Sequence, residues 1–558
     1  MVWSKRPAVQ QPPAKVKMCR SPGANRCQAS VFSYHAGRVH HQIVFMTMRA
    51  CITLMLLCLT PLLARADVLD GLDEWVDRER ERWGVPGLAL AVVHQDEVLL
   101  ARGFGQLGLD YDRPVDADTQ FAIASLSKAM TATALGLLVE EGRLDWDDRV
   151  IDHVPEFRLS DDWVSAQVTV RDLLSHRVGV GRLFGNRLTF MPARSRAEFI
   201  KHLAHHEFEQ AFRQGYVYSN AMYTVAGEVL ERVSGQSWES FLTERLFEPL
   251  GMQRSNVSIG ELDDNAALPH QEIGGELVTI ERRDWGYSGP AAAVNSSMND
   301  LARWMRFNLG EPGQLDGETL LDESVMQSIH RPSSLTGFDD DEQAIAGYGL
   351  GWGLARYRGF HVLRHGGASD GFHSQIWLLP ELDLGIVISA NTFTELRNPL
   401  FKHIVDRLAG LPEKDWMDQA HADYLEDRQQ ARDAREGVHA QRQADTQPSH
   451  ELQAYTGEYH DPLYDTARVS LVDGRLMVTL WDDESQTLAL EHWHHDTFRA
   501  SWRNPAQREK FVWFRMDSDG APDTLKVHFT LRPEMLQEGI YPADYTRVVE
   551  FHRIEPER

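Results

Sequence analysis

Cysteine is almost absent from this sequence. The chain has 558 residues but only four cysteines, and all four lie before residue 59, in a segment that we expect the mature protein to lose. Disulfide bonds and thiol chemistry both require cysteines that persist in the folded protein. Neither is therefore expected to contribute to the stability or the activity of the mature chain.

Positive charge is also in short supply. The formal net charge is -25, from 57 basic and 82 acidic residues. The first 66 residues hold nine of the bases and no acid, so the rest of the chain is more acidic still. Nucleic acids and anionic lipids both require a basic face. We therefore expect neither as a partner, whereas the length allows two or three soluble domains.

An apolar run near the N-terminus has the features of a targeting signal. Met48-Arg49 precedes the run 50–63, and Ala64-Arg65-Ala66 follows it. The run is too short to span a bilayer comfortably, and its small-residue end is typical of a signal peptide. We expect a spurious or unstructured extension at 1–47, a signal peptide at 48–66 and cleavage after Ala66. The mature protein would be secreted or periplasmic, without stable membrane insertion.

Lysine is rare where arginine is plentiful. Beyond residue 66 the sequence has six lysines: Lys128, Lys201, Lys402, Lys414, Lys510 and Lys526. Lys128 follows Ser125 by three residues, at the start of an apolar, helix-forming segment that ends at Gly142. Residues three apart share one helix face, so the ammonium would lie beside the hydroxyl. Since a serine needs a neighbouring base to become a nucleophile, the pair predicts nucleophilic chemistry.

The remaining pattern predicts a mixed architecture. Residues 88–94 and 97–102 form a predicted hairpin, a mainly helical stretch covers 145–250, and strands return at 349–355, 361–364, 374–379 and 384–391. We expect an α/β (α+β) fold, an antiparallel sheet flanked by helices with a helical lobe, over 67–412. A charged helical linker at 413–450 and a small all-β barrel domain at 451–558 would follow.

Two further segments carry groups suited to acyl chemistry. Tyr218 and Asn220 lie at a predicted helix start, where a tyrosine near a cation could act as a base and an amide could hold a substrate amide. The alternative is a buried aromatic and a helix cap. His365-Gly366-Gly367 ends a predicted strand, where glycines let a substrate backbone approach. A glycine-rich turn with an exposed histidine is the alternative there.

The order and spacing of these three motifs resemble those of the class C β-lactamase-like serine hydrolases, a family that includes penicillin-binding-protein-like esterases and D-amino-acid peptidases. The resemblance extends over about 70 to 410, and Tyr455-Thr-Gly-Glu-Tyr459 resembles a small β-barrel domain often appended to such proteins. Other matching stretches are 170–179, 247–252, 289–297 and 348–353.

The resemblance implies a role for each motif residue. Ser125 would be the acylated nucleophile, with Lys128 and Tyr218 sharing the base and acid roles. Asn220 would bind the substrate amide. The backbone amides of Ser125 and Ala368 would form the oxyanion hole. The reaction would require no metal and no cofactor, and the β-barrel domain could join identical copies into a homo-oligomer.

The third motif departs from the family pattern. His365 stands where β-lactamases and transpeptidases of this fold carry the lysine of Lys-Thr-Gly, ahead of the substrate-binding Gly366 and Gly367. A permanent cation at this position holds the substrate carboxylate, whereas a histidine is mostly neutral at pH 7. We therefore expect a small-molecule or peptide substrate with an ester or amide bond, and treat a genuine β-lactamase as a weaker alternative.

Other interpretations of the sequence remain open. The chain could be a catalytically silent sensor that binds peptides or wall fragments in the same cleft. Ser369 lies in a Gly-x-Ser-x-Gly pattern, but a nucleophile elbow requires a following helix, and residues 372–379 alternate like a strand. Residues 103–108 match a dinucleotide fingerprint, which we interpret as a loop. Histidines at 202 and 206 and at 492–495 lack a third metal ligand.

Overall fold

The computed structural model describes residues 69–181, 195–339, 342–503, 510–530 and 546–554. The expected signal peptide and the segment before it lie outside these residues. A nine-stranded antiparallel sheet has the order β10-β11-β12-β13-β14-β15-β1-β2-β3. Its strands are β1 (Gly87–His94), β2 (Glu97–Gly108), β3 (Tyr111–Pro114), β10 (Ser334–Asp339), β11 (Ala344–Tyr348), β12 (Gly353–Tyr357), β13 (Phe360–Ser369), β14 (Phe372–Leu379) and β15 (Leu384–Ala390).

The predicted N-terminal hairpin is confirmed. Gln95 and Asp96 both have positive φ, 54° and 61°, as a two-residue hairpin turn that matches the strand twist requires. The expected loop at 103–108 is wrong, because these residues continue β2. Its glycines serve close packing: a Cβ at Gly103 would lie 2.3 Å from the carbonyl of Val115.

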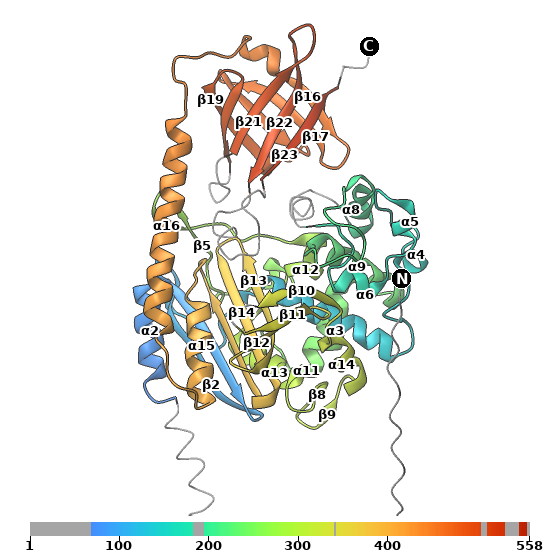
Figure 1. Ribbon diagram of the computed structural model, residues 1–558, viewed down its shortest axis with the longest axis vertical. Coiled ribbons are helices and arrows are strands. Elements are labelled where there is room, and N and C mark those ends of the chain that lie inside the picture. The colour runs from blue at the N-terminus through green and yellow to red at the C-terminus, as the bar shows by residue number, and fades with distance from the viewer. Residues whose placement is uncertain (1–68, 182–194, 340–341, 504–509, 531–545, 555–558) are drawn as a thin grey trace, which may run out of the picture. The chain divides into compact units, whose positions relative to one another are not determined.

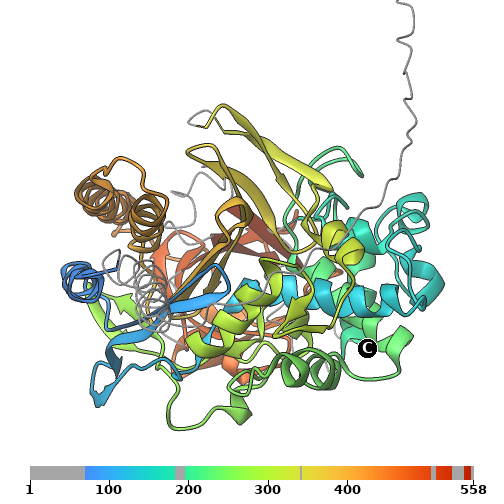
Figure 2. The ribbon, with the colours of Figure 1, turned by 90° about the horizontal axis from the view of Figure 1, so that it is seen from below.

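Helices cover both faces of the sheet (Figures 1 and 2). One face packs on α2 (Leu72–Arg82) and α15 (Arg397–Leu408), through alternate residues of β1 such as Leu88 and Leu90. The opposite face, with Ala89 and Ala91, packs on α13 (Met298–Asn308) and the helical lobe. Because both faces are covered, β1 is apolar nearly throughout, as strands buried on both sides are.

The helical lobe is built around two long helices, α3 (Ser127–Glu140) and α9 (Asn220–Ser234), which pack against each other. Shorter elements surround them: α4 (Val150–His153), α5 (Asp162–Ser165), α6 (Val170–Leu174), α8 (Arg196–His202), α10 (Trp238–Leu242), α11 (Glu248–Leu250), α12 (Gly289–Ala292) and α14 (Glu323–His330). Three two-stranded pairs lie outside the large sheet and the barrel: β4 (Phe121–Ala122) with β7 (Asn295–Ser296), β5 (His270–Ile273) with β6 (Glu276–Thr279), and β8 (Gln314–Leu315) with β9 (Glu318–Thr319).

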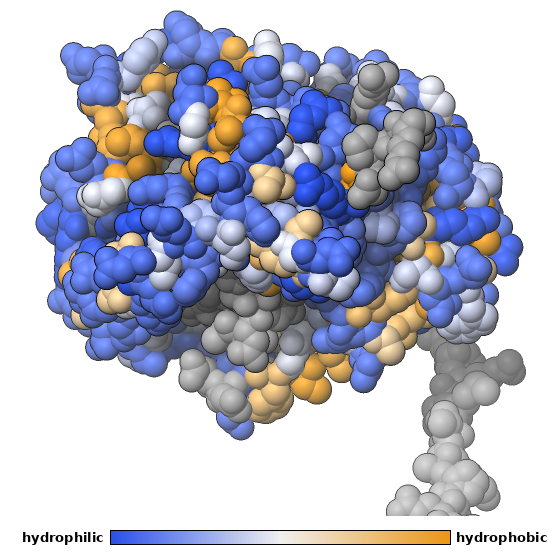
Figure 3. All heavy atoms as spheres, turned by 90° about the horizontal axis from the view of Figure 1, so that it is seen from above, coloured by the Kyte–Doolittle hydropathy of each residue, from blue (hydrophilic) through white to orange (hydrophobic). Residues whose placement is uncertain are grey.

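The C-terminal region forms a closed eight-stranded barrel after the 25-residue helix α16 (Trp416–Ala440). Its strands are β16 (Gly457–Asp461), β17 (Asp465–Val472), β18 (Arg475–Leu480), β19 (Thr487–His494), β20 (Thr497–Trp502), β21 (Lys510–Met516), β22 (Pro522–Thr530) and β23 (Thr546–Arg553). The α/β class, with a helix-flanked antiparallel sheet followed by a β-barrel, is therefore confirmed. Within the described ranges, no helix combines the length and apolar character needed to cross a bilayer. Hydrophilic residues cover most of the face seen in Figure 3.

Candidate active site

Ser125 lies in a tight turn between a short strand and a buried helix. The 3-10 turn at Ala124–Leu126 precedes α3, so Ser125 is not part of the α-helix as the sequence pattern suggested. Ala124 has a φ of 49°, an uncommon conformation for a residue with a side chain. Two bonds hold the turn: Ser127 Oγ donates to the Ala124 carbonyl at 2.6 Å and accepts the Val294 N–H at 3.1 Å. The half-buried Ser125 side chain is therefore carried by a fixed backbone.

The ammonium of Lys128 lies beside the hydroxyl of Ser125. Lys128 is 0% exposed, and its Nζ donates to Ser125 Oγ at 3.0 Å, to Asn220 Oδ1 at 2.7 Å and to the Ala291 carbonyl at 2.8 Å. The aromatic rings of Tyr218 and Tyr223 have centroids 4.8 and 5.3 Å from Nζ. Burial of an ammonium is unfavourable unless polar groups surround it. These neighbours explain how an apolar helix tolerates a buried lysine.

Tyr218 and Asn220 meet this pair from the start of α9. The hydroxyl of Tyr218 donates to Ser125 Oγ at 2.9 Å, so Ser125 has two polar neighbours capable of proton transfer. Ser219, between Tyr218 and Asn220, caps α9 by accepting the N–H of Met222. Asn220 is thus the first residue of the helix rather than its cap, and its side-chain oxygen contacts Lys128.

A buried network behind Tyr218 was missed by the sequence analysis. The ring of His176 lies 4.3 Å from that of Tyr218, and its Nδ1 accepts the N–H of Ser219 at 3.1 Å. Four residues before His176, the fully buried carboxylate of Asp172 forms ion pairs with Arg177 and Arg213. The segment 170–179 matched the family pattern, but nothing local in it indicated that it supports Tyr218.

His365 lies on β13 and is 7% exposed. Its Nδ1 lies 2.7 Å from the carbonyl of Gly366, and its Nε2 lies 2.8 Å from the hydroxyl of Tyr348. A carbonyl only accepts, so Nδ1 carries a proton, and in the neutral ring Nε2 accepts from Tyr348. Burial raises the pKa of Tyr348 well above its usual value, which keeps this donor protonated. Tyr348 is a second residue that sequence reasoning did not single out.

The two glycines after His365 differ in their surroundings. A Cβ at Gly367 would lie 2.1 Å from the carbonyl of Ile123, so only glycine lets β13 approach the Ser125 turn. Gly366 is exposed and leaves the strand surface open. Ala368 follows in β13, paired with His373 of β14. The structure thus brings the His365–Ala368 segment and the Ser125 turn together.

The competing sites do not have the geometry that they require. Ser369 is 7% exposed, its Oγ accepts the indole N–H of Trp285 at 3.3 Å, and the turn after it leads into the strand β14 rather than a helix. This overturns a nucleophile elbow. In the described part of the chain, no three side chains of His, Cys, Asp or Glu converge in the manner of metal ligands. His206 and His492 each face a backbone carbonyl instead.

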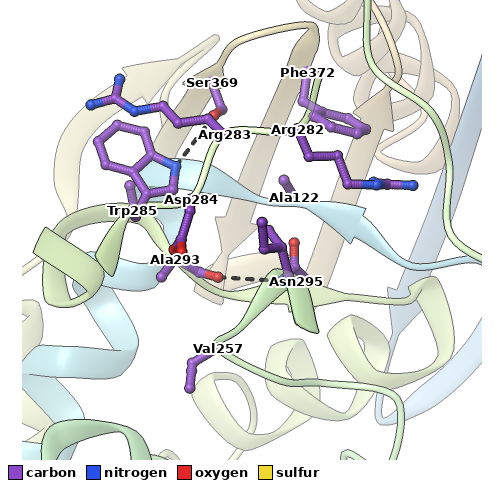
Figure 4. Close-up of a pocket in the computed structure, with 12 residues that line it drawn as sticks. Ala122, Val257, Arg282, Arg283, Asp284, Trp285, Ala293, Asn295, Ser369 and Phe372 are labelled. Carbon is purple, nitrogen blue, oxygen red and sulfur yellow. Dashed lines mark hydrogen bonds between the residues drawn. The ribbon is translucent and has the colours of Figure 1, made fainter. Parts of the chain in front are cut away.

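A small pocket lies among residues of β4, α12 and the end of β13 (Figure 4), and none of Ser125, Lys128 and Tyr218 is among its lining residues. Its lining includes Ala122, three residues before Ser125, and Ser369, which follows Ala368. Ala292 also lines it, directly after the residue whose carbonyl accepts a bond from Lys128. The remaining lining residues are Val257, Ile259, Arg282, Arg283, Asp284, Trp285, Ala293, Asn295 and Phe372.

Comparisons with known proteins agree with this arrangement. The Beta-lactamase family model matches residues 72–411, and a domain of unknown function (DUF3471) matches residues 441–539. A relative named Unguisins hydrolase ungD', from Aspergillus campestris, is 28% identical over 494 residues, which are 83% of this chain and 86% of that protein. Protein flp of Staphylococcus aureus is 26% identical over 343 residues, 60% of this chain and 65% of its own length.

Two solved structures share the fold. The octameric penicillin-binding protein homologue from Pyrococcus abyssi has a TM-score of 0.56 at 20% identity, covering 82% of this chain and 98% of its own. SurE has a TM-score of 0.53 at 19% identity, covering 88% and 100%. Since the family match covers more than half of the 558 residues and the fold agrees with it, the chain belongs to the β-lactamase family of penicillin-binding-protein-like serine hydrolases.

Proposed function

We propose that the protein is an exported serine hydrolase that cleaves ester or amide bonds of small molecules or peptides, in the manner of an esterase or a D-amino-acid peptidase. One observation carries the proposal: Ser125 Oγ lies within hydrogen-bonding distance of both Lys128 Nζ and Tyr218 Oη. A nucleophile in contact with a candidate base is what acyl transfer requires. A catalytically silent sensor has no need of all three groups.

The proposed reaction proceeds through an acyl-enzyme. With one proton removed from the Lys128–Tyr218 pair, which leaves a neutral amine or a phenolate, the pair accepts the hydroxyl proton of Ser125 as Oγ bonds to the substrate carbonyl carbon. The carbonyl electron pair moves to oxygen, where the backbone amides of Ser125 and Ala368 stabilise it. Collapse breaks the bond to the leaving alcohol or amine, which takes the proton. Water then repeats the sequence and releases the acid from Ser125.

Covalent labelling tests this proposal. A fluorophosphonate should add once to the purified protein and not to Ser125→Ala, as read by intact mass, because only an activated serine reacts readily. Ser369→Ala is the matched control and should be labelled like the wild type. Absence of any adduct on the wild type would favour the silent sensor. Equal labelling of the wild type and Ser125→Ala would contradict the assignment of the nucleophile.

The residue at 365 should decide how strongly β-lactams bind. Because His365 is engaged with Tyr348 and the Gly366 carbonyl, it supplies no permanent cation for a substrate carboxylate. We expect His365→Lys to lower the inhibition constant of benzylpenicillin against ester hydrolysis by about tenfold, through a new charge-assisted bond. His365→Gln is the neutral control. An unchanged inhibition constant in the lysine variant would count against this role.

Export and assembly belong to the same proposal. The apolar run at 50–63 and the small-residue pattern ending at Ala66 support cleavage of a signal peptide.

The proposed boundaries are 67–412 for the hydrolase domain, 413–450 for the linker and 451–558 for the β-barrel domain. The octameric Pyrococcus abyssi homologue supports self-association of this chain as well.

A further inference from the structure

Tyr218 lies in a segment with no regular secondary structure of its own. Residues 216–219 belong to neither a helix nor a strand, and α9 begins only at Asn220. The Tyr218 hydroxyl nevertheless donates to Ser125 Oγ at 2.9 Å. A group that transfers a proton must lie within hydrogen-bonding reach, and a displacement of about 1 Å can lower a rate by about 10²-fold. The contacts that hold this segment therefore decide whether Tyr218 can act on Ser125.

One residue, His176, holds the segment on both sides of Tyr218. The N–H of Val217 donates to the His176 carbonyl at 2.7 Å, and the N–H of Ser219 donates to His176 Nδ1 at 3.1 Å. Ser219 is fully buried, and a buried N–H requires an acceptor. The His176 ring also lies against the Tyr218 ring, with the two centroids 4.3 Å apart and the planes inclined by 34°. The two N–H groups that flank Tyr218 therefore both donate to a single histidine.

His176 is itself held in one orientation. It is 0% exposed and its φ is 59°, a conformation that residues with a side chain adopt rarely and that is found preferentially at functional sites. The rings of Tyr216, Tyr223 and Tyr348 lie 5.5, 5.2 and 4.8 Å from its own, so the imidazole cannot turn freely. Because Nδ1 accepts an N–H, the neutral ring carries its proton on Nε2. The lone pair that accepts from Ser219 is therefore fixed in place.

We propose that His176 is a positioning residue for the reaction at Ser125. Its Nδ1 lone pair, through the N–H of Ser219, sets the place of the Tyr218 hydroxyl. The inference rests on the proposed function, because it assumes that Tyr218 takes part in proton transfer from Ser125. His176 exchanges no proton in this reaction and acts through Tyr218 alone.

Two substitutions of nearly equal shape separate this role from packing. Leucine and asparagine both remove the ring, but only asparagine offers an acceptor, Oδ1, at the position of Nδ1. We expect His176→Leu to lower the second-order rate constant for fluorophosphonate addition to Ser125 by about 10²-fold, as a small displacement of a reacting group does. His176→Asn should react about tenfold faster than His176→Leu, because one hydrogen bond is restored. All rates are measured well below the Tm of the least stable variant.

A second variant and a control complete the set. His176→Phe keeps a ring beside Tyr218 without the acceptor, and should react at least about tenfold more slowly than the wild type. His270→Leu is the matched control, because His270 is also fully buried and its Nε2 accepts the N–H of Leu109 at 3.1 Å. His270 lies on β5, outside the segments that carry the three motifs. Its variant should react within about twofold of the wild type, as distant sites act independently.

Hydrogen exchange of the peptide 216–222 reports on the same bond without any chemistry at Ser125. Exchange should be faster in His176→Leu than in the wild type, and slower in His176→Asn than in His176→Leu. Equal labelling rates in the leucine and asparagine variants would overturn the positioning role and leave the hydrolase intact. If the wild type is not labelled, or Ser125→Ala is labelled equally, the proposed function is wrong. Exchange alone then decides whether His176 holds the Tyr218 segment, and equal exchange in the two variants would refute it.

Discussion

Replacing Lys128 with methionine is expected to lower kcat/KM for ester hydrolysis by about 10³-fold, the usual range for loss of a general base. The physical reason is the geometry at Ser125, whose Oγ lies 3.0 Å from the buried Nζ. Methionine keeps an unbranched apolar stem of similar length, so the packing of α3 is largely retained while the proton acceptor is removed. Steady-state kinetics with 4-nitrophenyl acetate measures the effect.

Lys201→Met is the matched control for that variant. Lys201 lies on α8, is exposed, and is not part of the candidate active site. Its substitution should leave kcat/KM within about twofold, because surface changes away from special features have small effects. Thermal unfolding should show that both variants are folded. A Lys128→Met protein that kept a tenth of the wild-type rate would assign the base to Tyr218 or to another group.

Asp172→Asn should lower the free energy of unfolding by about 1.5–3 kcal/mol, the range for hydrogen bonds to charged groups, because Arg177 and Arg213 are 25% and 42% exposed and their charges still reach water. The Asp172 carboxylate is fully buried and accepts hydrogen bonds from Arg177, Arg213 and Thr169. Asparagine has nearly the same shape but leaves two guanidinium groups without their counter-charge. Urea unfolding followed by circular dichroism measures the loss. A difference under 1 kcal/mol would contradict this account.

The ion pairs of Asp172 also predict how the difference in the free energy of unfolding between the wild type and Asp172→Asn depends on pH. Burial alone raises the pKa of the Asp172 carboxyl, but the hydrogen bonds from Arg213 and Thr169 and the charges of Arg177 and Arg213 outweigh it, so the pKa lies below its ordinary value. The stabilisation is therefore complete above the unfolded-state pKa of about 3.9 and is lost as the pH falls through the lower folded-state pKa. The wild-type advantage should shrink only in that acidic range.

Asp147→Asn is the control for charge alone. Asp147 pairs with Arg171, but its side chain is 64% exposed. An exposed pair contributes about 0–1 kcal/mol, because water screens it. Asp172→Asn should also reduce activity. The backbone N–H of Arg213 donates to the Arg177 carbonyl, and that of Val217 donates to the His176 carbonyl, so these bonds connect the Asp172 network to the segment that holds Tyr218. Asp147→Asn should leave the activity unchanged.

Local patterns in the sequence predicted local structure well. The alternation at 88–102 and its two-residue turn predicted β1 and β2, and the apolar segment after Lys128 predicted α3. The Asp473-Gly474 turn joins β17 and β18 as expected. These features depend on neighbouring residues alone. The glycines at 103–108 suggested a loop, but they are needed because β2 packs closely against Val115 and Pro86. The local sequence does not show that packing.

The sequence predicted which residues form the candidate site but not how these residues are arranged in space. Ser125 and Lys128 could be paired by spacing, but the contacts of Lys128 with Asn220 and Ala291 join segments far apart in the chain. His365 was expected to be an exposed or substrate-facing group, and the structure shows it buried against Tyr348 from another strand.

The middle of the large sheet has a consequence for the order of biosynthesis. β1 pairs with β15 from Leu88↔Ala390 to His94↔Leu384, and the Gly87 N–H donates to Asn391 across 304 residues of chain. During translation the edge of β1 that pairs with β15 therefore has no partner until residues 384–390 have left the ribosome. Such late closure slows folding and exposes apolar strands to aggregation. Ser125, Lys128, Tyr218 and His365 all precede β15 in the chain, so the strand that joins β14 to β1 is synthesised after every one of these residues.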